Sequence, residues 1–466
     1  MMGKETRRKG IEWRVAGWMV RHPGISAAPA VLGAGVAELG PAGAGATLAA
    51  LGVAGLSWYR GHPETFDRYA APYVRAFRRR WLRYVGRRWR DLMIDCEFGR
   101  ENRRTGHIEV PRLLRVRSAS PSIDTLYVKV LRGQSLKRFQ DAQDELAMAL
   151  RADALGIVKV QPGVIALTVV RGNPFADVID PAEVPVDSAD VDLRNLYFGE
   201  DEYGNDWTEP LLGHHLIGCG ATGSGKDSLI WNPLRGMGPA IRDGLVRVDF
   251  LDLKGGMAAG TARSLFHRYA AEPDTGLEVI EAFRDDMKAT QRHLAERGLR
   301  KFTVSRETPF RVLMIDELAM MTALGSSSTT RAAIKLMAEV MTQGRAPGFA
   351  LCAYVQEPTK DIVPVRDLFT RRICLRTTAE NHPDMVLGEG MRIKGALTDE
   401  IPADEEYAGI GFRVDQRSRR PTRVRAGWVS DADIAELVRT CTPGPVDESN
   451  VVQFHRDEDQ DEDEVA

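Results

Sequence analysis

Cysteine is scarce in this chain. The 466 residues include five cysteines, and no two of them form a Cys-x-x-Cys pair. Paired cysteines at short spacing are typical of zinc sites and of small domains stabilised by disulfides, so the pattern argues against both classes. Scattered cysteines fit a protein whose bulk lies in the reducing cytoplasm.

Net charge is nearly absent as well, at −2, and therefore indicates no partner by itself. With 27% charged and 43% hydrophobic residues, the chain has the balance of a globular protein of two or three domains. The charges are unevenly distributed, because arginines crowd the first quarter and acids crowd the last ten residues. Residues 431–466 are interpreted as a short helix followed by an acidic, disordered tail.

Long hydrophobic runs are limited to two uncharged stretches, residues 25–37 and 42–58, with a turn signal at 38–41 between them. A helix over the second stretch would span roughly 25 Å, somewhat short of a hydrocarbon core of about 30 Å. Basic residues flank the pair on both sides, which predicts that both ends stay cytoplasmic. Residues 1–95 are therefore interpreted as a membrane hairpin and an arginine-rich helix against anionic headgroups, at the cell membrane. A soluble Ala/Gly-rich hairpin is the alternative, and DNA phosphates could use the same arginines.

Residues 96–198 turn globular. Period-two alternation around 126–130, and apolar runs at 157–160 and 164–170, predict strands, and residues 135–153 have a helical pattern. We expect a small α/β module with a structural or DNA-guiding role, because no residues in it have catalytic spacing.

The segment GCGATGSGKDSL, residues 218–229, follows a short apolar strand pattern and precedes a helical one. It fits the phosphate-binding pattern G-x-x-x-x-G-K-[ST] up to the last letter, where Asp227 stands and Ser228 follows. Backbone N–H groups of such a loop cradle phosphates at a helix N-terminus, and Lys226 would reach the terminal ones. The predicted nucleotide-binding residues are Gly220, Ala221, Thr222, Gly223, Ser224, Gly225, Lys226, Asp227 and Ser228.

Further apolar runs end in polar residues. The segment 311–321 delivers Asp316 and Glu317 at a strand tip, where Asp316 would hold Mg²⁺ and Glu317 would orient or deprotonate a water. Residues 246–256 form a similar strand with a polar loop, 349–358 one that ends at Gln356, and 371–378 a fifth strand. Gln356 could sense the γ-phosphate. Strands alternating with helices predict an α/β core with a mainly parallel sheet over residues 199–430.

The ordered motifs GATGSGK, LDLKGG, MIDE, QGRAPGF, YVQEP, TRRICLRTT and DMVLGEGM resemble those of the FtsK/SpoIIIE family of double-stranded DNA translocases, over roughly residues 135–430. The compact plan looks most like the Tra-type transfer proteins of actinobacterial plasmids and integrative elements. The resemblance implies a RecA-like P-loop motor that assembles as a homo-hexamer and hydrolyses ATP to move duplex DNA. It carries over the phosphate loop, Asp316 and Glu317 as the Walker B pair, Gln356 at its strand end, and Arg345 as an arginine finger that reaches a neighbour's ATP.

The chain departs from the family's pattern at Asp227, where a hydroxyl would bind magnesium. One helical position is about 100° of rotation, so Ser228 does not simply replace it. The metal ligands are therefore expected among Asp227, Ser228 and Asp316. The predicted C-terminus also has too few residues for a DNA-reading winged helix, so separate DNA-recognition or septal proteins would guide loading. A protein-secretion ATPase of the same superfamily and a nucleotide-binding membrane scaffold without turnover remain the alternatives.

Overall fold

The computed structural model describes residues 23–102, 106–175, 177–257, 259–414 and 419–444. The basic residues predicted to flank the apolar pair on its N-terminal side, and the acidic tail, lie outside the described residues. The chain divides into two units, Met1–Phe77 and Arg78–Ala466. The domain boundaries expected from the sequence stay predictions.

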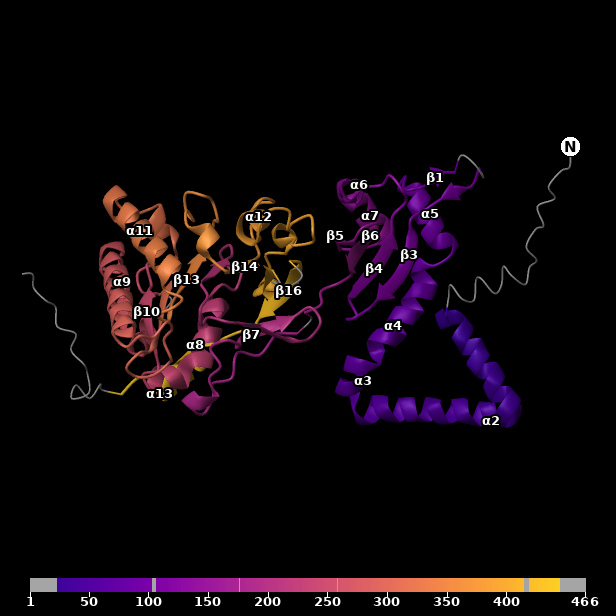
Figure 1. The fold of residues 1–466 in the computed structure, drawn as a ribbon, viewed down its shortest axis with the longest axis horizontal. Helices are drawn as coiled ribbons and strands as arrows, with labels where there is room; N and C mark the ends of the chain where they lie inside the picture. The colour runs from indigo at the N-terminus through magenta and orange to yellow at the C-terminus, as the bar shows by residue number, and fades with distance from the viewer. Residues whose placement is uncertain (1–22, 103–105, 176, 258, 415–418, 445–466) are drawn as a thin grey trace, which may run out of the picture. The chain divides into compact units, whose positions relative to one another are not determined.

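The first unit is helical. Helix α2 (Pro23–Gly61) contains a break at Gly40, whose φ of 71° and ψ of 166° are not helical, and α3 (Pro63–Tyr69) follows. Figure 1 shows the two straight parts of α2 meeting at a sharp bend. The break falls inside the turn predicted at residues 38–41. Among the described residues, no helix combines the length and the hydropathy that a membrane crossing requires, so the expected transmembrane helices are not found.

The second unit begins with a small α/β sheet region. Its helical lead-in and its strands are α4 (Ala71–Arg79, which starts in the first unit), a π-helical turn Arg80–Tyr84, α5 (Arg87–Asp95), β1 (Arg100–Glu101), β2 (Ile108–Glu109), β3 (Arg112–Arg117), β4 (Ile123–Lys129), α6 (Leu136–Asp141), α7 (Gln143–Leu150), β5 (Ala154–Gln161) and β6 (Val164–Val170). Strands β3, β4, β6 and β5 form an antiparallel sheet in that order. The core packs Leu126 and Leu167 of this sheet with Phe139 and Leu146 of the two short helices.

A ten-stranded mixed sheet forms the rest of the unit, in the order β11-β10-β12-β13-β9-β14-β15-β16-β7-β8. Its strands are β7 (Leu196–Asp201), β8 (Asp206–Glu209), β9 (Leu216–Cys219), β10 (Val246–Leu251), β11 (Arg268–Ala270), β12 (Phe310–Ile315), β13 (Phe349–Val355), β14 (Arg371–Leu375), β15 (Ile410–Val414) and β16 (Pro421–Ala426). The strands from β11 to β14 in this order run parallel, as predicted. Four antiparallel strands that the sequence analysis did not predict extend the sheet from β14.

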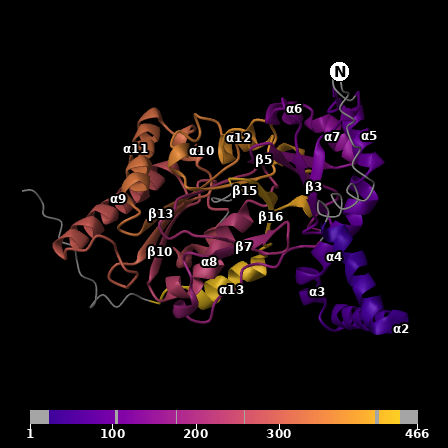
Figure 2. The ribbon, with the colours of Figure 1, turned by 45° about the vertical axis from the view of Figure 1, so that its right-hand side comes forward.

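Helices cover both faces of the parallel strands. They are α8 (Asp227–Arg242), α9 (Pro273–Glu296), α10 (Ala319–Thr322), α11 (Ser327–Gln343), α12 (His382–Leu387) and α13 (Asp431–Cys441). Helices α9 and α11 lie together, as do α8 and α13 (Figures 1 and 2). Within β12, Leu313 and Ile315 join the cluster of α9 and α11, whereas Val312 and Met314 join the cluster of α8 and α13. Burial on both faces explains why these strands read as continuous apolar runs.

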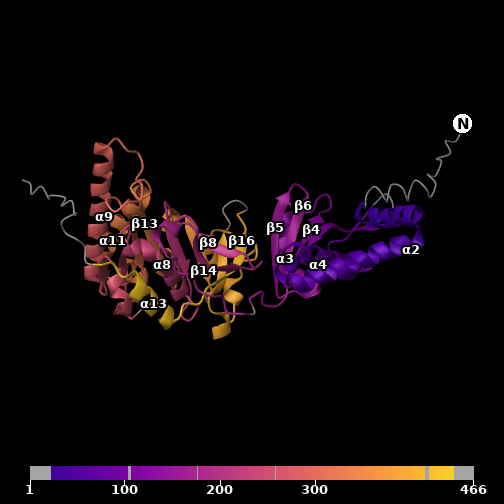
Figure 3. The same cartoon turned by 90° about the horizontal axis from the view of Figure 1, so that it is seen from below.

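Parallel pairing brings the carboxyl ends of neighbouring strands to one edge of the sheet. Strand β9 lies between β13 and β14, and β12 and β10 follow on the β13 side. Figure 3 gives a second view of β13, β14 and α8 together. In open α/β sheets, ligands bind at this edge, so the loops that follow these five strands are the place to look for a site.

Candidate nucleotide-binding site

The phosphate-type loop connects the central strand β9 to helix α8. Gly223 and Gly225 have φ angles of 72° and 82°, a region that favours glycine. A Cβ atom on Gly225 would also collide with the backbone of Gly409, and a Cβ on Gly220 with the Ser224 hydroxyl. The glycines of the motif are therefore required by the backbone path and by close packing.

Three neighbouring segments hold the loop in place. The backbone N–H of Gly220 donates to the carbonyl of Val355 at the end of β13, at 3.0 Å, and that of Ala221 donates to the carbonyl of Arg376 after β14, at 2.9 Å. Gly409 donates to the carbonyl of Ser224 at 2.8 Å. The loop is thus tied to the ends of both strands that flank β9. Because α8 begins at Asp227, the positive end of a 16-residue helix faces this loop.

The predicted acidic pair lies beside the loop lysine. Strand β12 ends at Ile315, and the side chains of Asp316 and Glu317 that follow are buried. Lys226 Nζ lies 3.4 Å from Glu317 Oε2. Lys226 is itself buried, which is unusual for a lysine unless it is paired. The structure therefore brings together the lysine and the carboxylates that are far apart in the sequence.

A second lysine completes this cluster. Lys254, in the loop after β10, lies 3.2 Å from Glu317 Oε2 and 3.7 Å from Asp316 Oδ2. Desolvation alone would lower the pKa of Lys254, but the charges of Asp316 and Glu317 raise it overall. The sequence analysis assigned Lys254 to a polar strand end and not to the site. Its position directly after a parallel strand was the signal that could have found it.

Burial dominates the electrostatics of Asp316. Desolvation raises the pKa of its carboxyl group, the charges of Lys226 and Lys254 oppose that effect, and the charges of Asp227 and Asp252 add to it. One oxygen of each acid, Asp316 Oδ1 and Glu317 Oε1, is buried without a hydrogen-bond partner. Buried acceptors without partners are costly, and a cation would satisfy them.

Magnesium fits this donor set in a limited way. Two carboxylates with unsatisfied oxygens are the oxygen ligands that Mg²⁺ prefers, and Mg²⁺ in nucleotide sites commonly uses one or two carboxylates together with phosphate oxygens. In the part of the chain that the structure describes, no group of three or more His, Cys, Asp or Glu side chains could hold a metal by itself. The residues therefore suit a metal that arrives with a nucleotide.

Asp227 and Ser228 occupy different environments at the start of α8. Asp227 is exposed, and its charge acts on Asp316, so it lies near the acidic pair. Ser228 is buried. The two candidates for the missing magnesium ligand are thus separated by the rotation between successive helical residues.

Two polar side chains from the flanking strands lie over the loop. Gln356, directly after β13, accepts a hydrogen bond through Oε1 from the Thr222 hydroxyl at 3.2 Å. Arg376, directly after β14, donates from its guanidinium to the Thr222 carbonyl at 2.6 Å. Gln356 was predicted at this edge, whereas Arg376 was missed as a site residue. Its place at the end of the TRRICLRTT strand, next to β9 in the sheet, could not be read without the strand order.

Arg345 is not part of this cluster. It lies exposed in the turn between α11 and β13, at the amino end of the strand whose carboxyl end carries Gln356. A Cβ on Gly213, in the turn before β9, would be 3.6 Å from the Arg345 side chain. Arg345 therefore sits at the opposite edge of the sheet from the loop of its own chain.

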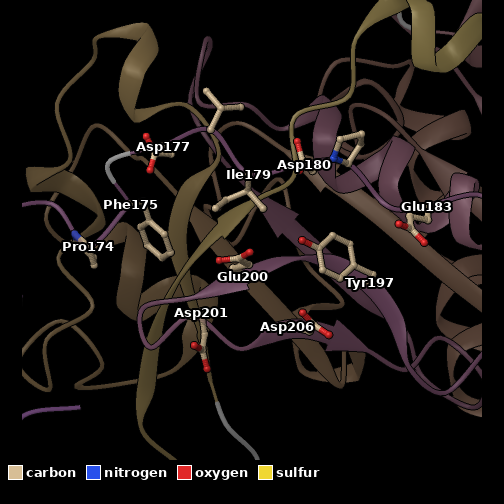
Figure 4. Close-up of a pocket in the computed structure, with 13 residues that line it drawn as sticks. Pro174, Phe175, Asp177, Ile179, Asp180, Glu183, Tyr197, Glu200, Asp201 and Asp206 are labelled. Atoms are coloured by element: carbon tan, nitrogen blue, oxygen red, sulfur yellow. The ribbon is translucent and has the colours of Figure 1, made fainter. Parts of the chain in front are cut away.

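A cavity of about 760 Å³ lies elsewhere, between the 174–183 segment and the β7–β8 hairpin (Figure 4). Its lining includes six acidic residues, namely Asp177, Asp180, Glu183, Glu200, Asp201 and Asp206. Burial, followed by the charges of Asp206 and Asp201, raises the pKa of Glu200. Such a lining repels phosphate groups, so this cavity is no candidate for the nucleotide.

Comparison with known proteins gives relatives but no family model, because none matches the chain. A protein named DNA translocase FtsK from Chlamydia trachomatis serovar D is 24% identical over 356 residues, which are 69% of this chain and 42% of the relative. DNA translocase FtsK from Listeria monocytogenes serovar 1/2a is 22% identical, over 68% of this chain and 43% of its own length. The chain thus spans less than half the length of the curated relatives it matches.

Solved structures with a similar arrangement include the pCW3 conjugation coupling protein TcpA, in its monomer form with ATPγS. It is 17% identical with a TM-score of 0.48, over 71% of this chain and 93% of that one. The cytoplasmic domain of the type VII secretion ATPase EccC from Thermomonospora curvata is 19% identical with a TM-score of 0.46, over 59% and 33%. The sequence relatives confirm the resemblance that the ordered motifs indicated: this chain is a relative of the proteins named DNA translocase FtsK.

Proposed function

We propose that this protein is a P-loop ATPase that uses ATP hydrolysis to move double-stranded DNA. One observation carries the proposal: a glycine loop at a helix N-terminus lies beside a buried lysine and carboxylate cluster, with Lys226 Nζ 3.4 Å from Glu317 Oε2. A loop lysine and two acids at the next strand ends are the groups that phosphoryl transfer to water needs. The sequence relatives named DNA translocase FtsK supply the class of substrate.

Each residue then has a chemical role. The loop and Lys226 would bind the β- and γ-phosphates of ATP, while Arg376 and Gln356 border the same loop through Thr222. Asp316, with Asp227 or Ser228, would hold Mg²⁺, which neutralises the charge of the terminal phosphates when bound. Glu317 Oε1, buried and without a partner, would accept the proton of the attacking water.

Assembly as a homo-hexamer would give Arg345 its role. A guanidinium at the far edge of the sheet does not serve the site of its own chain, but an exposed arginine in a turn suits contact with a neighbour's nucleotide. In a ring, each subunit presents one edge to the site of the next. Arg345 is therefore proposed as an arginine finger that acts between subunits.

Anchoring at the membrane, with the motor in the cytoplasm, is proposed from the helical first unit. Trp58, Tyr59 and Tyr69 are exposed there, among arginines such as Arg60 and Arg68. Aromatic rings and basic side chains together suit the headgroup region of an anionic membrane. The biological role that fits is transfer of plasmid or element DNA between cells, with separate DNA-recognition or septal proteins that guide loading.

The test is nucleotide turnover by the purified full-length protein. Hydrolysis of Mg-ATP should rise with double-stranded DNA and fall with added salt, because phosphate contacts are salt-dependent. It should be lost in Lys226→Ala and kept in Lys301→Ala, an exposed lysine in the loop before β12. Stimulation by a polypeptide in place of DNA would favour a protein-secretion ATPase. Nucleotide binding without turnover would favour a scaffold, and either outcome would overturn the proposal.

A further inference from the structure

Lys254 contacts the acidic pair from a third strand. Its ammonium lies 3.2 Å from Glu317 Oε2, the same oxygen that Lys226 approaches, and 3.7 Å from Asp316 Oδ2. The carboxylates are almost fully buried, whereas the Lys254 side chain keeps 38% of its surface exposed. Glu317 is therefore held between two cations that enter from different sides, one through the phosphate loop and one through the loop after β10.

The loop that carries Lys254 is itself fixed. Asp252 is fully buried, and its Oδ2 accepts hydrogen bonds from the Ala259 N–H at 2.8 Å and the Tyr269 hydroxyl at 3.2 Å. Gly255 and Gly256 follow Lys254 with φ angles of 79° and 78°, and the Gly256 N–H donates back to the Asp252 carbonyl at 3.2 Å. A tight turn that depends on two glycines thus aims Lys254 at the acids.

The two lysines differ in what else they can bind. Lys226 belongs to the phosphate loop, so a bound triphosphate competes with Glu317 for its charge. Lys254 belongs to a different loop, which contributes nothing to the phosphate loop's backbone. A proton acceptor must keep one orientation through the reaction, and a single long carboxylate side chain loses that order easily. Lys254 is the cation available to hold it.

We propose that Lys254 is a positioning residue that holds the Glu317 carboxylate in its reactive orientation while Lys226 is engaged by the phosphates. This inference rests on the proposed ATPase function and adds a member to the same site. It does not make Lys254 a phosphate ligand, which distinguishes it from Lys226.

The first experiment compares wild type, Lys254→Met, Lys254→Arg and the control Lys301→Met in DNA-stimulated hydrolysis. Methionine keeps the length of the stem and removes the charge. We expect kcat to fall about 10- to 100-fold in Lys254→Met, the usual cost of losing a supporting contact, with KM changed less than about twofold. Arginine should restore part of kcat, and Lys301→Met should match wild type. An unchanged kcat in Lys254→Met would overturn the inference while leaving the ATPase proposal intact.

A binding measurement separates positioning from loss of the fold. Lys254→Met should bind a fluorescent ATP analogue in the absence of Mg²⁺ as tightly as wild type and should melt at a similar temperature. A tenfold weaker affinity would mean that Lys254 touches the nucleotide, and the positioning role would be wrong. Absence of turnover in the wild type would instead contradict the proposed function itself.

A double-mutant cycle tests whether Lys254 acts through Glu317. Glu317→Gln removes the charge that Lys254 contacts, so adding Lys254→Met to it should cost little further activity. Independent roles would make the two losses multiply, and that result would refute the inference.

Discussion

At the scale of single residues, the site is a balance between burial and pairing. Taking Asp316 and Glu317 out of water is expensive, and two lysines within 4 Å recover part of that cost. Because one oxygen of each acid remains without a partner, the arrangement is incomplete until a ligand arrives. Such unsatisfied groups are common where a protein binds a cation.

Asp227 and Ser228 give the residue-scale prediction. Asp227→Ala should raise the Mg²⁺ concentration required for half-maximal hydrolysis about tenfold, because the exposed Asp227 carboxylate lies near Asp316 and adds to the negative charge that attracts the metal. Ser228→Ala should leave it within about twofold, since Ser228 is buried against the protein interior. Magnesium titrations of ATPase activity measure both. The reverse order of effects would assign the ligand to the hydroxyl.

At the scale of elements, the hairpin β7–β8 carries a buried acid in its turn. Glu202 is 9% exposed, and its backbone N–H donates to the Arg423 carbonyl on β16 at 2.9 Å. Burial raises the pKa of Glu202 to about 7, against smaller opposing effects of Tyr203 and Arg423. The side chain is therefore protonated in the folded state at pH values where it is ionised in the unfolded chain.

This raised pKa predicts a pH-dependent gain from Glu202→Gln. The stabilisation that comes from the protonated folded form is fully present below the unfolded pKa of about 4.3 and is lost as pH rises through about 7. Glutamine does not titrate, so the variant should gain up to about 3 kcal/mol relative to wild type at pH 8.5 and nearly nothing at pH 4.5. Urea unfolding at the two pH values measures it. Exposed Glu281→Gln is the control, and equal gains at both pH values would contradict the assignment.

The elements also explain which strands the sequence revealed. The runs that became β10, β12, β13 and β14 are apolar because both faces of the sheet are covered, and length and hydrophobicity suffice to detect them. The antiparallel extension was not predicted. Its strand β16 pairs with β7, more than 200 residues earlier in the chain, and no local pattern records such a pairing.

At the scale of the whole molecule, the position of Arg345 predicts complementation between subunits. Arg345→Ala should lower kcat by about 10³-fold or more if it serves as a finger, and Lys226→Ala should be inactive. Mixing the two variants should restore activity, because an intact loop then meets a neighbour that still has Arg345. Random mixing in equal amounts would give about a quarter of the wild-type rate.

The control for that mixture is the double variant Arg345→Ala/Lys226→Ala with Lys226→Ala, in which no subunit has an intact loop and no activity should return. Failure of the first mixture to recover, with both variants folded and assembled, would exclude a finger that acts between subunits.

The sequence by itself determined the chemistry that this chain can support. Glycines at fixed spacing, a lysine and an acidic strand tip follow from local rules of backbone conformation and of burial, so Lys226, Asp316, Glu317 and Gln356 could be named without coordinates. Strand order decided the rest. It joined Lys254 and Arg376 to the site and moved Arg345 to the opposite edge, because the distance between side chains on different strands depends on which strands are neighbours and in which direction they run, and that is fixed only when the sheet forms.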